Sequence, residues 1–125
     1  MTKRNDKAIL LNARNNTVEF ITIKDYTDIS KFGKFDLFTT VEMDERGNTM
    51  YVDDEGLLNG TNVGFEVDGY EQPLMGNAVI LGTNRNTGDS KDTDLSLEDV
   101  AKMVNCFVLF GRTMFKAPTR PKVVA

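Results

Sequence analysis

The sequence predicts an α+β protein: a small, mostly antiparallel β-sheet of about five to six strands, one C-terminal amphipathic helix and one short helix. Short runs of β-branched and apolar residues alternate with clusters of Asn, Asp and Gly, as strands alternate with turns. The early links are hairpin-sized, which favours antiparallel pairing. Near the C-terminus, Leu97, Val100, Ala101 and Val104 recur at helical spacing. The order of these segments does not fit a Rossmann or P-loop layout.

The first half of the chain predicts two β-hairpins with a short helix between them. The pair Asn15-Asn16 separates the first two runs and suits a tight turn. We expect Gly33 to end the helix. In the second hairpin, we expect Gly47 or Asn48 to adopt a positive φ angle. The expected elements are strands over residues 7–13, 17–23, 35–43 and 48–53 and a helix over residues 26–32.

The second half predicts further strands and the main helix. Residues 62–68 alternate in hydrophobicity and indicate a strand or an edge segment. Residues 76–82 form a continuous apolar run, which is typical of a central strand buried on both faces. Pro73 cannot donate to a sheet and marks a loop, and residues 83–92 are polar like a surface loop.

The main helix is expected over residues 96–104. Ser96 can cap its N-terminus with Asp99 at the third helical position, which makes a capping box. The apolar run that follows is either a last short strand or an extension of the helix. Residues 1–111 are expected to form a single α+β domain, and residues 112–125 a basic, proline-containing tail, either flexible or an extended arm.

Composition indicates a folded, soluble protein. The chain has 125 residues, of which 40% are apolar and 27% charged, enough for one domain with a modest core. No apolar run approaches the roughly 18–20 residues that cross a bilayer, and the polar N-terminus does not resemble a signal peptide, so we expect a cytosolic protein. Residues 25–99 hold 17 acidic and 5 basic side chains, while both ends are basic. Such an acidic body repels a nucleic-acid backbone.

Several residue types that carry enzymatic chemistry are missing. The chain has no histidine and one cysteine, Cys106, which excludes an intrachain disulfide, Ser-His and Cys-His catalysis and the usual zinc sites. Cys106 lies in an apolar run and is expected to be a small buried hydrophobic residue. We therefore expect no cofactor and no metal.

Three consecutive carboxylates, Asp53, Asp54 and Glu55, follow an apolar strand in the stretch MYVDDEGLLNG. In an extended chain Asp53 and Glu55 point to one side and Asp54 to the other, so the three do not converge. We interpret them mainly as a solvated strand end before a turn, with a metal or ligand role and a partner contact as alternatives. The later stretch GDSKDTD does not match a calcium-binding loop, because a lysine occupies its third position.

The polar stretch TNRNTG holds the candidate ligand-binding residues Asn84, Arg85 and Asn86. A guanidinium beside amides and a hydroxyl can hold a phosphate or a nucleotide. The competing interpretation is a solvated surface loop.

The stretches MYVDDEGLLNG, GYEQPLMGNAVILG and LSLEDV together resemble a known family. It is the domain-of-unknown-function family 3846, which is associated with phages and plasmids, and the resemblance covers roughly residues 7–104. It implies a small accessory protein encoded by a phage or another mobile element, with no catalytic residues to carry over. The positions that match the family pattern, to which we assign a structural role, are Tyr51, Asp53, Asp54, Gly56, Pro73, Gly76, Asn77 and Gly82.

These observations lead to three hypotheses on function. The first is a non-enzymatic phage accessory protein in the host cytoplasm that binds a host protein or associates with itself. The second is a protein that binds or sequesters a small nucleotide-type signal of host defence. The third is a divalent-metal enzyme that uses Asp53 or Glu55.

Overall fold

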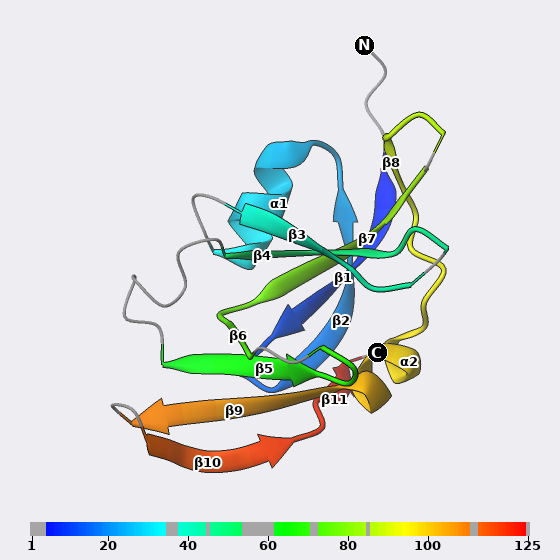
Figure 1. Ribbon diagram of the computed structural model, residues 1–125. Coiled ribbons are helices and arrows are strands. Elements are labelled where there is room, and N and C mark those ends of the chain that lie inside the picture. The colour runs from blue at the N-terminus through cyan, green and yellow to red at the C-terminus, as the bar shows by residue number, and fades with distance from the viewer. Residues whose placement is uncertain are drawn as a thin grey trace.

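The computed structural model describes residues 5–34, 38–44, 46–53, 62–70, 73–84, 86–110 and 113–124. Two β-sheets and two helices make up the fold (Figure 1). In chain order the elements are β1 (Asp6–Asn12), β2 (Thr17–Ile23), α1 (Tyr26–Gly33), β3 (Phe38–Glu42), β4 (Thr49–Asp53), β5 (Val63–Val67), β6 (Leu74–Met75), β7 (Ala78–Thr83), β8 (Ser90–Lys91), α2 (Leu97–Met103), β9 (Val104–Phe110), β10 (Thr113–Thr119) and β11 (Lys122–Val124).

The larger sheet has seven strands in the order β11-β2-β1-β7-β4-β3, with β8 added to β7. Both predicted hairpins are confirmed, since β1 pairs with β2 and β3 with β4 in antiparallel register. Strand β7 lies between the hairpins and pairs antiparallel with both β1 and β4. Residues 78–82 of this strand are all buried, as the continuous apolar run predicted.

The α+β class is confirmed, but the prediction of one sheet with five to six strands was wrong. The described residues form eleven strands in two sheets, because β10, β9, β5 and β6 make a separate four-stranded sheet. One pair in the larger sheet, β11 with β2, is parallel. Local patterns show where strands lie, whereas the pairing of distant strands depends on contacts that the pattern does not contain.

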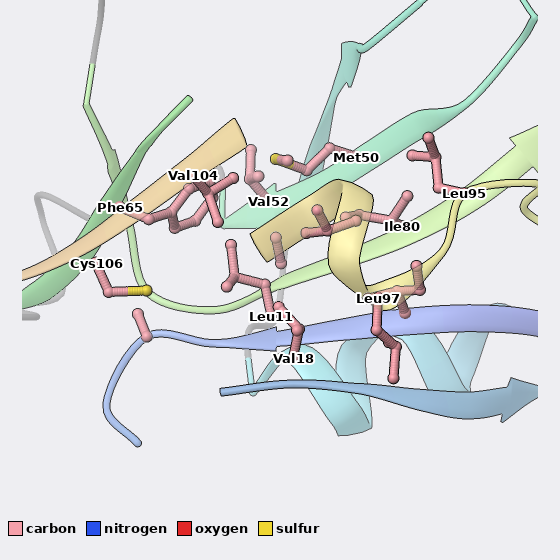
Figure 2. Close-up of a cluster of buried hydrophobic side chains, with 14 of the residues drawn as sticks. Leu11, Val18, Met50, Val52, Phe65, Ile80, Leu95, Leu97, Val104 and Cys106 are labelled. Carbon is pink, nitrogen blue, oxygen red and sulfur yellow. The ribbon is translucent and has the colours of Figure 1, made fainter. Parts of the chain in front are cut away.

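The larger sheet separates two apolar cores. On strand β1, Ile9 and Leu11 face one core while Ala8 and Leu10 face the other, because successive side chains point to opposite faces. Helix α1 covers one face, and α2 with the smaller sheet covers the other. In the core that Ile9 and Leu11 face, shown in Figure 2, labelled side chains from both sheets and the α2 region lie together: Leu11, Val18, Met50, Val52, Phe65, Ile80, Leu95, Leu97, Val104 and Cys106.

Helix α1 ends one residue later than the sequence predicted, and a different residue makes the stop. The helix includes Gly33, so the position after its end falls on Lys34. Lys34 takes the left-handed conformation, with φ 58° and ψ 48°, and its N–H donates to the carbonyl of Ser30. A lysine in this conformation is strained by about 1–2 kcal/mol relative to glycine.

The C-terminal segment, for which the sequence predicted either a flexible tail or an extended arm over residues 112–125, contributes a strand to each sheet. Strand β10 pairs with β9, and β11 pairs with β2. The N–H of Lys122 donates to the carbonyl of Asn16 at 2.9 Å, and the Arg120 guanidinium donates to the carbonyl of Val104 at 3.3 Å. The β2 partner of β11 lies far away along the chain, so that pairing has no local signal, whereas β10 follows its partner β9 directly.

Helix α2 starts with the predicted capping box. The Ser96 hydroxyl accepts from the Asp99 N–H at 3.0 Å, and the Asp99 carboxylate accepts from the Ser96 N–H at 3.0 Å. The bonds from the backbone and side chain of Ser96 hold the pKa of the Asp99 carboxyl below its ordinary value. The box fixes the first turn of the helix whose Leu97 and Val100 enter the core.

Replacing Ser96 by alanine is expected to lower the free energy of unfolding by about 1 kcal/mol, because one N–H of the first turn loses its acceptor. Urea denaturation measures the change. Ser96→Thr, which keeps a hydroxyl cap, is the matched control and should lose clearly less. Equal losses in the two variants would show that the hydrogen bond is not the cause.

Candidate functional site

In the loop that was predicted to bind a ligand, the side chain of Asn84 bonds within the loop. The Asn84 side-chain oxygen accepts from the backbone N–H of Asn86 at 2.9 Å and of Thr87 at 3.4 Å. Asn86 is exposed, and Arg85 lies outside the described residues. The structure thus shows Asn84 shaping a turn, and ligand binding at this loop stays a prediction.

Two residues of the family pattern, Tyr51 and Gly82, make close packing contacts within the fold. Tyr51 on β4 is buried and meets Phe38 edge to face, with ring centroids 5.2 Å apart and an interplanar angle of 72°. At Gly82, an added Cβ would collide with the carbonyl oxygen of Asp92, where β7 runs beside β8. Pro73 is exposed ahead of β6, whereas Asp54 and Gly56, like Glu55, lie outside the described residues.

Three other residues of the pattern come together at a hollow that we call the polar pocket. Asp53 at the end of β4 and Gly76 and Asn77 ahead of β7 meet the β1–β2 turn and the end of α1 there. The pocket has a volume of about 180 Å³. The described residues that line it are Asn12, Arg14, Asn15, Gly33, Lys34, Asp53, Val63, Gly76 and Asn77.

Backbone hydrogen bonds fix two carboxamides of the polar pocket. The side-chain oxygen of Asn77 accepts from the Ala13 N–H at 3.2 Å, and that of Asn12 accepts from the Asn15 N–H at 3.0 Å. These bonds fix the orientation of each carboxamide, and each amide nitrogen is the group that can donate.

A second hollow, which we call the apolar groove, lies between β2, β11 and the start of α2. Its volume is about 380 Å³. Phe20, Val123 and Val124 expose 44%, 39% and 40% of their surfaces there, and the Lys7 ammonium lies 5.0 Å from the centroid of the Phe20 ring. The described residues that line the groove are Glu19, Phe20, Ser96, Leu97, Glu98, Val123 and Val124.

A buried polar network, centred on Asn48, joins the β3–β4 turn to the segment before α2. The Asn48 amide donates to Asp44 at 2.8 Å and to Asp94 at 2.7 Å, and its oxygen accepts from the hydroxyl of Thr93 at 2.7 Å. Burial raises the pKa of Asp44. Hydrogen bonds from the side chain and backbone of Asn48 and from the backbone of Arg46 lower it by more, so the net pKa is below the ordinary value. The network is structural, because its groups satisfy one another.

Among the described residues, no three His, Cys, Asp or Glu side chains are placed to hold a metal ion together. Neither α1 nor α2 is long and apolar enough to cross a membrane. Of the carboxylates proposed for metal chemistry, Asp53 lines the polar pocket, while Glu55 lies outside the described part of the chain.

Comparison with known proteins identifies the family. A family model described as Domain of unknown function (DUF3846) matches residues 7–107, which cover most of the chain and every described residue that lines the polar pocket. No curated protein and no solved structure matches. The pattern of motifs that suggested the family is thus confirmed, and the chain belongs to the DUF3846 family.

Proposed function

We propose that the protein is a non-enzymatic accessory protein of a phage or another mobile element, which acts in the host cytoplasm by binding a host protein at the apolar groove. The observation that carries the proposal is the gathering of Phe20, Val123 and Val124 around one hollow, each about two-fifths exposed. Exposed apolar side chains are unremarkable singly, but a contiguous group beside a hollow indicates a protein-binding surface. The lack of histidine in the chain agrees with a binding role.

The groove suits an extended segment of the partner. Strand β11 is at the end of the strand order of the larger sheet, and an end strand can accept one more strand from another chain. A segment added beside β11 would place alternate side chains next to Val123 and Leu97. Among the described residues that line the groove, the ionisable ones are Glu19 and Glu98, which are both acidic. The partner segment is therefore expected to combine apolar with basic residues.

Replacing Phe20 by serine is expected to abolish capture of the partner. An aromatic anchor in an interface often contributes 2 kcal/mol or more, so the dissociation constant should rise at least about thirtyfold. Affinity capture from host lysate with the wild-type chain, followed by mass spectrometry, identifies the partner. Titration of the purified partner against both chains then measures the change.

Tyr70→Ser is the matched control, because Tyr70 is a 40% exposed aromatic residue that does not line the groove. It should bind like the wild type. A partner that binds both variants equally would overturn the proposal. So would a light-scattering mass of two chains that Phe20→Ser reduces to one, because the groove would then serve self-association.

A further inference from the structure

We propose that the polar pocket is a binding site for a small ligand that carries a phosphate group. The site is distinct from the apolar groove and from the loop of Asn84, and it does not rest on the proposed function. It lies wholly within the residues that the family model matches, whereas the groove includes Val123 and Val124 beyond it.

The charges of the pocket favour an anion. Arg14 and Lys34 line it, and neither forms an ion pair with a residue in the described part of the chain. Asp53 supplies one negative charge, so the described lining has a net charge of +1. Both cations are exposed at the rim, where water screens them, so position rather than charge alone must supply selectivity.

The carboxamides supply that positioning. Because the oxygens of Asn12 and Asn77 are held by backbone N–H groups, their amide nitrogens are the free ends, and these can only donate. With Arg14 and Lys34, the pocket thus offers four donor groups from three separate segments of the chain. A phosphate has three acceptor oxygens and uses such a set fully, while a carboxylate has two.

The end of α1 acts against an anion, since the carbonyl end of a helix is its negative pole. At an exposed site that effect is weaker than one hydrogen bond between charged groups. Lys34 also stands at this helix end and opposes the dipole there. The donors of the pocket therefore outweigh the helix.

The volume limits the size of the ligand. The volume of about 180 Å³ lies below the roughly 300 Å³ at which pockets for drug-sized molecules start. The pocket thus accommodates a phosphate and the first atoms attached to it, and the remainder of a larger ligand would extend outside. Glycerol 3-phosphate is a suitable probe.

The test follows backbone amide signals by NMR during titration with glycerol 3-phosphate at constant ionic strength. Saturable shifts are expected at residues 12–15, 33–34 and 76–77. Arg14→Gln should weaken binding at least about tenfold. Lys31→Gln, an exposed lysine of α1 outside the pocket, is the matched control and should bind like the wild type. Shifts that do not saturate, or equal affinities of Arg14→Gln and Lys31→Gln, would overturn the proposal.

A second variant separates binding from folding. Lys34→Gly removes one cation of the pocket and also relieves the left-handed strain at this position, so its melting temperature should equal or exceed that of the wild type. Binding should nevertheless fall about tenfold. Unchanged affinity in this variant would remove Lys34 from the site. Inorganic phosphate, run in parallel, shows whether the phosphate group alone suffices, and a preference for acetate over phosphate would also contradict the assignment.

Discussion

Replacing Gly47 by alanine is expected to destabilise the fold by about 3–5 kcal/mol, a large part of the 5–15 kcal/mol that holds a domain of this size together. Gly47 has a φ of +96°, which costs an alanine about 1–2 kcal/mol. The added Cβ would also collide with the carbonyl oxygen of Thr83, a backbone atom in β7. Relief of that collision moves apart the strands that the Thr83 N–H to Gly47 carbonyl bond, 2.9 Å long, holds together.

Gly69→Ala is the control that separates the effect of the collision with Thr83 from the effect of the positive φ angle. Gly69 has a φ of +84°, and nothing lies within 4 Å of an added Cβ. This variant should lose only about 1–2 kcal/mol. Urea denaturation of both variants measures the difference, which is expected to exceed 1 kcal/mol. Similar midpoints for the two would show that the Thr83 contact is accommodated without cost.

The sequence predicted the parts of the fold that local rules determine. Gly47, rather than Asn48, takes the positive φ in the second hairpin, and Asn16 takes it in the first, with φ 58°. The capping box at Ser96 and the fully buried run of β7 also follow from a few neighbouring residues. Each of these features depends on residue type and spacing within about ten positions, which is what a single sequence contains.

The second sheet, the two hollows and the Asn48 network depend on contacts between distant segments. The described lining of the polar pocket comes from five segments, and no spacing within one stretch indicates that Arg14 and Asn77 line the same hollow. The apolar groove is indicated in part by the sequence of strand β2. In the alternation of residues 17–23, Phe20 falls on the same face as Val18, yet Val18 is buried and Phe20 is not, because the start of α2 covers only part of that face.

Replacing Asn48 by leucine is expected to lower the free energy of unfolding by about 2–4 kcal/mol. Leucine has nearly the same shape, but Asp44 and Asp94 lose their donor and the Thr93 hydroxyl loses its acceptor. Thr93 is 1% exposed, so its hydroxyl cannot turn to water, and such an unsatisfied group costs about 1–3 kcal/mol. Asp94 is exposed and recovers part of its loss through hydration. Asn86→Leu, at an exposed loop position, is the control and should be nearly neutral.

The pH dependence of the same variant tests whether Asp44 carries part of the effect. Because the native pKa of Asp44 lies below its ordinary value, its contribution is complete above the unfolded-state pKa, and it is lost as the pH falls through the native one. The leucine variant lacks the Asn48 side-chain bond, so its native Asp44 pKa lies nearer the ordinary value. The wild type should therefore lose more stability on acidification than Asn48→Leu. The difference between their free energies of unfolding should shrink below about pH 4. A gap that stays constant would show that Asp44 is not coupled to Asn48.

Asn48→Asp is expected to respond to pH differently from Asn48→Leu, because it adds a titratable group. At neutral pH it adds a carboxylate beside Asp44 and Asp94, so it should be less stable than Asn48→Leu. That repulsion raises the native pKa of the new carboxyl, and a raised native pKa means that the folded state gains stability as the pH falls through it. As the pH is lowered, the difference in free energy of unfolding between Asn48→Asp and the wild type should therefore begin to shrink above pH 4. The corresponding difference for Asn48→Leu should begin to shrink only at a lower pH. Urea denaturation between pH 7 and pH 3.5 measures both curves, and closure of both gaps at the same pH would contradict the placement of Asn48 between the two carboxylates.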